Sequence, residues 1–280
     1  MRQVTKLLTR TLLHGASIYA LLLICSCQTT LSSSQTANES ESSTSGTVAP
    51  VGFSGRLELP LLAHSDKLIE HTGFTLVYNT HHRNAQWVAY ELTREKTIKG
   101  VERTDKFIAD PKLSEVTALD KDYYKSSYDR GHLAPAADMS WSETAMKESF
   151  YFSNISPQVP SFNRGVWKRL EDQVRWWAAS DSIIYVVTGP VLRDNLQRIG
   201  PNQVSVPELF YKVILVYKPH EKKGIGFIMK NEGSSLPVKN FAISIDSVQR
   251  ATGINFFPLL PDDEAKNLEQ SICRTCWNWK

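Results

Sequence analysis

The segment from Asp129 to Arg175 contains the kinds of side chain that can cut a phosphodiester bond. The tetrapeptide Asp129-Arg130-Gly131-His132 supplies a nitrogen base and a guanidinium group. It is followed by Asn154, Asn163, Glu171 and Arg175, which add oxygen donors for a metal ion and a second cation. A base for water, a metal ion and cations for phosphate oxygens are the components of metal-assisted hydrolysis. Nuclease activity is therefore the leading hypothesis.

His132 is the predicted base, because an unperturbed imidazole has a pKa of about 6.5 and can accept a proton near neutral pH. Gly131 is expected to let the backbone turn sharply beside it. The alternative for a lone histidine is a hydrogen-bonded core or surface group. We apply that alternative to the other histidines of the ordered region, which are His64, His71, His81, His82 and His220.

Asn163 has two interpretations. Its amide oxygen could bind Mg²⁺, which prefers oxygen ligands and keeps several waters. Zinc is less suitable, because no cluster of histidine or cysteine accompanies it. Asn163 also precedes the main predicted helix, where asparagine is a favoured N-cap. The metal ligand must be accessible, whereas the cap need not be.

Glu171 and Arg175 are one helical turn apart and lie close to Arg164 and Lys168. In the functional interpretation Glu171 hydrogen-bonds metal-bound water and Arg175 meets phosphate, for which a guanidinium fork is well shaped. In the structural alternative Glu171 and Arg175 form an exposed i,i+4 ion pair worth about 0.3 kcal/mol.

The elements that must position these residues are predominantly strands. Apolar, β-branched and aromatic residues predict strands at 74–78, 87–92, 183–188, 210–217, 225–229 and 241–245. Apolar positions at spacings of three and four predict a helix over 166–178, and shorter helices are expected after Asp246 and after Pro261-Asp262-Asp263. Loops are expected at 201–207 and 232–237.

The N-terminus is typical of an exported lipoprotein. Three basic residues precede a short apolar run, Ile18 to Ile24, and the following Cys25-Ser26-Cys27 suggests cleavage after Ser26 and lipid attachment to Cys27. An ordinary signal peptide is the alternative. We therefore predict a leader at 1–26, a lipid anchor with a Ser/Thr-rich tether at 27–52, and a single domain at 53–280. Gln28 after Cys27 favours the outer membrane or cell surface.

Composition excludes a general polycation. The leader holds three of the 32 basic residues and none of the 29 acidic ones, so the chain after cleavage has equal numbers of each. Affinity for phosphate must come from local clusters. Cys273 and Cys276 form a lone C-x-x-C pair, for which a local disulfide is the simplest interpretation in an oxidising compartment.

Several motifs together resemble the sugar-non-specific DNA/RNA endonucleases with a ββα-metal (His-Me finger) site, over about residues 70 to 265. The principal ones are Asp129-Arg130-Gly131-His132, Ser153-Asn154-Ile155-Ser156-Pro157-Gln158 and the stretch Asn163 to Glu171. Supporting segments are Trp87-Val88-Ala89-Tyr90, Val187-Thr188-Gly189-Pro190 and Leu260-Pro261-Asp262-Asp263. The resemblance implies an α+β fold with a central, mainly antiparallel sheet flanked by helices.

It also implies roles for single residues. His132 would be the general base, Asn163 the Mg²⁺ ligand, with Mn²⁺ as a substitute, and Glu171 the holder of metal-bound water. Asn154 would organise the site. Phosphate or transition-state contacts would come from Arg103, Arg130 and Arg175, of which Arg103 has little motif around it. Arg164 and Lys168 extend the basic surface for a polymeric substrate.

The expected reaction is Mg²⁺-dependent hydrolysis of DNA and RNA with 5′-phosphate products and little sequence preference, because phosphate contacts carry no base code. Two alternatives remain: an anchored nucleic-acid-binding protein without turnover, and a phosphodiesterase for small nucleotides. The sequence leaves the oligomeric state open.

Overall fold

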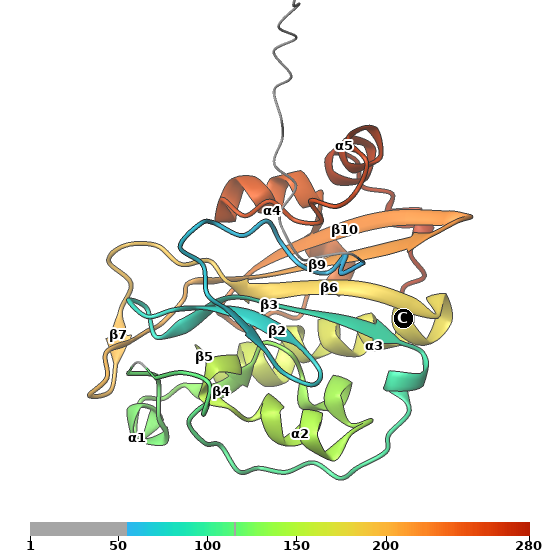
Figure 1. Cartoon of the computed structure of the whole chain (residues 1–280). Coiled ribbons are helices and arrows are strands. Elements are labelled where there is room, and N and C mark those ends of the chain that lie inside the picture. The colour runs from blue at the N-terminus through green and yellow to red at the C-terminus, as the bar shows by residue number, and fades with distance from the viewer. Residues whose placement is uncertain (1–54, 115) are drawn as a thin grey trace, which may run out of the picture. The chain divides into compact units, whose positions relative to one another are not determined.

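The computed structural model describes residues 55–114 and 116–280 (Figure 1). The predicted leader, Cys27 and the whole of the predicted tether therefore lie outside the described residues. Residues 52–280 form one compact unit. Within its described part, no helix is both long enough and apolar enough to cross a membrane.

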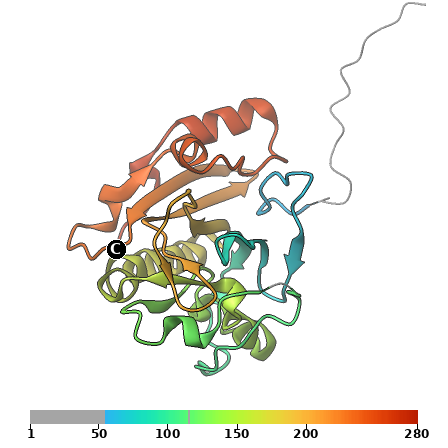
Figure 2. The ribbon, with the colours of Figure 1, turned by 90° about the vertical axis from the view of Figure 1, so that its left-hand side faces the viewer.

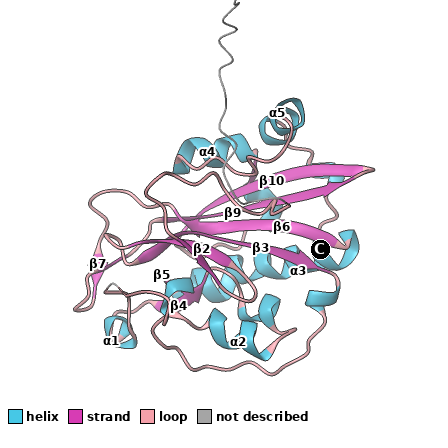
Figure 3. Ribbon diagram, viewed as in Figure 1, coloured by secondary structure: helices cyan, strands magenta, loops and turns pink. Residues whose placement is uncertain are grey.

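A seven-stranded sheet, antiparallel at every pairing, forms the centre of this unit (Figure 3). Its strands, in spatial order, are β1 (Leu68–Glu70), β2 (Thr75–Asn79), β3 (Asn84–Thr93), β6 (Ile183–Pro190), β9 (Leu209–Lys218), β10 (Glu221–Lys230) and β11 (Ala242–Ile243). With the helices beside it, this sheet confirms the predicted α+β class.

Helices cover both faces of the sheet (Figures 1 and 2). On one face, α3 (Lys168–Asp181) buries Leu170, Val174 and Trp177 in a core with β3, β6, β9 and β10. On the other, α4 (Ile245–Thr252) buries Ile245 and Val248, and α5 (Asp262–Gln270) packs beside it. Because alternate residues of a strand face opposite sides, the apolar central strands supply both cores.

The functional motifs lie in a second, smaller substructure beneath the α3 face. Strand β4 (Asp129–His132) pairs antiparallel with β5 (Ile155–Gln158), which leads into a π-helical segment (Phe162–Trp167) and then α3. The excursion between β4 and β5 contains a 3₁₀ turn (Ala136–Met139), α2 (Glu143–Ser149) and a second 3₁₀ turn (Phe152–Asn154). These elements form a ββα unit.

The structure corrects three local predictions. The main helix is preceded by the π-helical segment, whose backbone is non-helical at Gly165. The strand predicted at 241–245 is reduced to Ala242–Ile243, because Ser244 caps α4 by accepting a hydrogen bond from the amide of Ser247. The predicted loop at 201–207 contains β8 (Val204–Ser205), which pairs with β7 (Arg198–Ile199). The short helix α1 (Asp120–Tyr123) and strand β1 were not predicted.

The C-terminal segment is attached to α3. Cys273 and Cys276 form the local disulfide, with an S–S distance of 1.98 Å. Trp277, beyond it, is buried with its ring 4.5 Å from that of Trp177, and the indole N–H of Trp177 donates to the carbonyl of Asn278 at 2.6 Å. The tail therefore completes the core behind the helix.

Candidate active site

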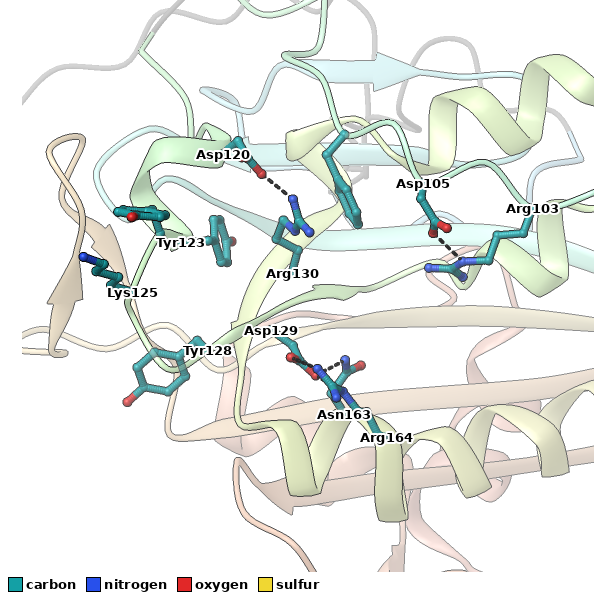
Figure 4. Close-up of a pocket in the computed structure, with 12 residues that line it drawn as sticks. Arg103, Asp105, Asp120, Tyr123, Lys125, Tyr128, Asp129, Arg130, Asn163 and Arg164 are labelled. Carbon is teal, nitrogen blue, oxygen red and sulfur yellow. Dashed lines mark hydrogen bonds and ion pairs between the residues drawn. The ribbon is translucent and has the colours of Figure 1, made fainter.

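A cleft of about 470 Å³ opens where β4 meets the π-helical segment (Figure 4). Its walls include four of the residues predicted to act on the substrate or the metal: Arg103, Arg130, Asn163 and Arg164. Asp129 and three tyrosines also line it. The β4–β5 hairpin brings these groups together although they span more than 60 positions of the chain.

His132 lies beneath this cleft between two aromatic rings. Its ring centroid is 5.6 Å from that of Phe107, a cleft residue, and 4.7 Å from that of Phe150. Nε2 is buried and has no hydrogen-bond partner among the described residues. Burial, followed by the charges of Arg103 and Arg130, lowers the pKa of His132 to about 3. The imidazole is therefore neutral at physiological pH, which is the state a proton acceptor requires.

Arg103 and Arg130 flank this aromatic pair. The guanidinium carbon of Arg103 is 4.9 Å from the Phe150 ring centroid, and that of Arg130 is 4.3 Å from the Phe107 ring centroid. Both distances suit cation–π contacts. Each guanidinium also pairs with an exposed carboxylate, Asp105 or Asp120. Exposed pairs of this kind are weak, so an incoming phosphate can replace them.

Asn163 is held by the first residue of the motif. Its Nδ2 donates to Oδ2 of Asp129 at 2.9 Å (Figure 4). Arg164 donates to the same carboxylate, from Nε to Oδ2 at 2.8 Å and from Nη2 to Oδ1 at 2.6 Å. These contacts lower the pKa of Asp129 even though burial opposes the shift. Ser161 precedes the helical segment, and Asn163 lies inside it. The N-cap interpretation of Asn163 is therefore wrong.

The donor set fits a hard, hydrated cation. Because Nδ2 of Asn163 is committed to Asp129, the amide oxygen is the atom left to bind a ligand, and no group in the described part of the chain donates to it. Within residues 55–114 and 116–280, no group of three or more histidine, cysteine or acidic side chains could form an all-protein cage. One amide oxygen with water in the remaining positions suits Mg²⁺ better than Zn²⁺.

Glu171 is partly buried on α3, and no hydrogen bond to its carboxylate is formed by a described residue. Burial raises the pKa of Glu171, and the ammonium of Lys212 opposes this rise. Asp138 raises the pKa further, whereas Arg175 lowers it. The predicted alternative of a Glu171–Arg175 ion pair is wrong, because Arg175 pairs with two other carboxylates.

Arg175 is bound to Asp138, which is fully buried and also accepts from the hydroxyl of Tyr90 at 2.8 Å. Its second partner is Asp172. Arg175 does not line the main cleft but a neighbouring cavity of about 270 Å³, which it shares with Arg103. Lys168 pairs with Asp172 at 2.6 Å and lines neither cavity. The structure thus places Arg175 beside the cleft and Lys168 outside it.

Asn154 is fully buried and acts on the backbone. Its Oδ1 accepts from the amide of Ala134, and its Nδ2 donates to the carbonyls of Ala134 and Ser149, all at 2.8 to 2.9 Å. Ala134 lies two residues beyond His132. Asn154 therefore holds the backbone just beyond β4, and it does not line the cleft.

The prediction that Gly131 allows a sharp turn is wrong. This glycine lies in regular strand opposite Ser156, and a Cβ atom there would overlap the side chain of Gln158, two residues further along β5. Gly131 is required for this close approach and not for a sharp turn. The two amide atoms of Gln158 are buried without partners among the described residues.

Sequence reasoning missed Lys212 and gave Asp129 no role of its own. Lys212, on β9, has no exposed surface, and its Nζ lies 4.8 Å from the Trp167 ring centroid without a hydrogen-bond partner in the described structure. Burial lowers its pKa. The sequence does contain a sign of Lys212. It lies midway between Phe210 and Ile214, at the spacing of two that puts all three residues on the same buried face of the strand. Asp129 could be recognised only by its contact with Asn163, 34 positions away.

Other buried histidines have structural partners, as expected. His71 Nε2 lies 2.9 Å from Asp110 Oδ2, and His82 Nδ1 lies 3.0 Å from Ser205 Oγ. Neither histidine lines the cleft.

Comparison with known proteins shows the family of this chain. Residues 60–263 match the family model of the DNA/RNA non-specific endonucleases. The chain is 35% identical to mitochondrial nuclease EXOG of Danio rerio over 231 residues (76% of this chain, 67% of that protein). It is 34% identical to human mitochondrial endonuclease G over 215 residues (71% of each).

A solved structure shares the fold. A chain of the EndoG/EndoGI complex superposes with a TM-score of 0.67 at 33% identity, covering 71% of this chain and 89% of that one. Sequence and fold therefore agree on the same relatives, and the ββα unit of β4, β5 and α3 occupies the matched region. The chain belongs to the DNA/RNA non-specific endonuclease family and is a hydrolytic nuclease.

Proposed function

We propose that this protein is a Mg²⁺-dependent endonuclease that hydrolyses DNA and RNA to products with 5′-phosphates, and that Mn²⁺ can replace Mg²⁺. The observation that carries the proposal is the position of His132, whose ring packs against Phe107 of a cleft that is also lined by Arg103, Arg130 and Asn163. A base, two cations and an oxygen ligand thus lie around one cleft.

His132 acts as the general base. A water proton passes to its ring nitrogen, the water oxygen forms a bond to phosphorus, and the bond from phosphorus to the 3′ oxygen breaks. The departing oxygen then takes a proton from solvent, and the phosphate stays on the 5′ side. Arg103 and Arg130 hold the phosphate in line and favour the charge that develops on its oxygens.

Asn163 would hold the metal ion through its amide oxygen, and Glu171 would hydrogen-bond the ion's hydration shell. When bound, the ion supplies positive charge beside the phosphate and the leaving oxygen. Asp129 binds the Nδ2 atom of Asn163, which leaves the amide oxygen for the ion. Glu171 must be ionised for this task, and Lys212 favours that state.

Low sequence preference follows from the chemistry of the cleft. Arginine, asparagine and carboxylate groups address phosphate and metal, and such contacts position a nucleic acid without identifying its bases. Arg164 lines the same cleft, and Arg175 lines the neighbouring cavity together with Arg103. An extended surface suits a polymer better than a small nucleotide.

We also propose that the chain is exported and anchored through lipidated Cys27, with the tether placing the nuclease domain away from the membrane. This rests on the apolar run and the Cys25-Ser26-Cys27 sequence. Metabolic labelling with a clickable fatty acid tests it. Cys27→Ser should abolish labelling, whereas Cys25→Ser should leave it intact.

The nuclease proposal is tested by incubating the purified chain with supercoiled plasmid and with a long RNA, in Mg²⁺, in Mn²⁺ and in EDTA. Cleavage of both polymers that requires metal, with 5′-phosphate ends detected by ligation, supports it. Binding without cleavage would favour the binding-protein alternative. Turnover of small diesters alone would favour the phosphodiesterase.

A further inference from the structure

One wall of the cleft is made of tyrosines. Tyr124 and Tyr128 line it, and both belong to the loop between α1 and β4. Tyr124 has 73% of its surface exposed, the highest value among the large hydrophobic residues of the described chain. The ammonium of Lys125 lies 5.1 Å from its ring centroid. An aromatic ring this exposed, next to a site for phosphate, can stack against a ligand that has a flat face of its own.

The base of this loop is tied to a separate hairpin. Asp122, buried at the end of α1, accepts hydrogen bonds from the amide of Leu119 and from both the amide and the Nδ2 of Asn202, all at 2.8 to 2.9 Å. Asn202 belongs to the turn between β7 and β8, 80 positions away. These hydrogen bonds fix the end of α1, from which the loop with Tyr124 and Tyr128 begins.

The loop also adopts an unfavourable backbone. Lys125 and Ser127 have φ angles of 55° and 67°, in the left-handed region that residues with a Cβ atom rarely occupy. Strain of this kind costs about 1–3 kcal/mol per residue and concentrates at functional sites. Beneath the loop, Tyr123 is buried and stacks on Phe152 at 5.8 Å. Tyr128 packs against the small core that contains Tyr123 and Phe152.

We propose that Tyr124, supported by Tyr128 and Lys125, is a stacking platform for an unpaired base next to the scissile phosphate, and that it directs the enzyme to single-stranded nucleic acid. The proposal rests on the proposed nuclease function and deepens it. The arginines can reach the backbone of any nucleic acid, but a base can lie on Tyr124 only when it is not stacked inside a duplex.

Binding measurements separate the contribution of the arginines to affinity from that of Tyr124. A chain carrying His132→Ala, kept in EDTA, is titrated with a fluorescent 12-nucleotide oligothymidine and with a 12-base-pair duplex. Adding Tyr124→Ala should weaken single-strand binding roughly tenfold, as expected for one lost base–aromatic stack, and change duplex binding less than twofold. Tyr124→Trp should retain single-strand affinity.

Tyr217 provides the matched control. It lies on β9 outside the cleft, with the ammonium of Lys222 4.7 Å from its ring centroid, so it is a similar lysine–tyrosine pair. Tyr217→Ala should leave both affinities unchanged. Thermal unfolding of each variant establishes that the fold is intact.

An abasic scan locates the base. In the active chain, an abasic residue moved along the oligonucleotide should slow cleavage roughly tenfold at one position beside the cut, and Tyr124→Ala should remove that sensitivity. The inference is overturned if Tyr124→Ala leaves single-strand binding unchanged, or weakens single-strand and duplex binding equally. If the wild-type chain cleaves neither polymer, the proposed function itself fails.

Discussion

Asn163 donates a hydrogen bond from Nδ2 to Oδ2 of Asp129 at 2.9 Å, across the junction of β4 and the π-helical segment. The contact fixes which atom of the amide is left for a ligand. An asparagine without this partner could present either oxygen or nitrogen, and nitrogen repels a cation. The first residue of the Asp-Arg-Gly-His tetrapeptide therefore orients the predicted metal ligand, while the last supplies the base.

Removing this partner should weaken metal binding. Asp129→Ala is expected to reduce Mg²⁺ affinity about 10- to 100-fold, the usual effect of losing a residue that orients a ligand. Isothermal titration with Mg²⁺ and the metal dependence of cleavage measure it. Asp120→Ala is the control, since Asp120 lines the same cleft and pairs with Arg130 but does not bond Asn163. Equal Mg²⁺ affinity in the two variants would contradict the orienting role.

The lowered pKa of His132 should appear in the pH dependence of stability. The unfolded chain binds a proton at this residue below about pH 6.5, whereas the folded chain does so only near pH 3, so stability falls as the pH drops through this interval. Replacing His132 by leucine removes the effect.

Between pH 7 and pH 5, the wild-type chain should therefore lose about 2 kcal/mol more unfolding free energy than His132→Leu. Urea denaturation at the two pH values, without metal, measures the difference. Parallel losses in both proteins would show that the folded-state pKa of His132 is not depressed.

Lys212 should determine how far activity extends toward acidic pH. Its charge lowers the pKa of Glu171, so Lys212→Met allows that pKa to rise, and Glu171 becomes protonated at a higher pH. We expect roughly tenfold lower kcat/KM at pH 6 and a much smaller loss at pH 9. Lys168→Met, on the surface of α3, should leave the profile unchanged. A loss of activity that is uniform across pH would point to a packing defect.

Gly131 and Gln158 should behave as a coupled pair. Gly131→Ala forces a methyl group into the side chain of Gln158 and should destabilise the chain by about 1–3 kcal/mol. Adding Gln158→Ala makes room and should recover most of the loss. A double-mutant cycle by thermal unfolding gives the coupling, and additive effects would contradict the close packing.

Sequence periodicity was sufficient for the long elements and insufficient for the site. The strands on β3, β6, β9 and β10 and the helix α3 were predictable because each is long and has its own apolar pattern. Strand β4 has only four residues, three of them charged or polar, and its partner β5 contains Pro157. Such a hairpin has no local signal and is stabilised by contacts distant in the chain.

Identities of site residues were easier to predict than their partners. The motif led to the prediction of His132, Asn163 and Glu171 without knowledge of the fold, and their catalytic roles stay predictions. The partner of Arg175 could not be foreseen, because Asp138 becomes its neighbour only when the β4–β5 excursion folds onto α3. The same holds for Asn154, whose amide sits on the backbone of Ala134. The N-cap of α4 at Ser244 could have been predicted from the sequence, but Ser244 lies within an apolar run that we interpreted as a strand.

The most direct test of the account is the single-turnover cleavage rate of His132→Ala at saturating enzyme with Mg²⁺, compared with wild type and with His64→Ala, an exposed histidine outside the cleft. The rate should fall about 10²- to 10⁴-fold for His132→Ala, with substrate affinity retained, and remain unchanged for His64→Ala. A His132→Ala rate within a factor of three of wild type would contradict His132 as the general base.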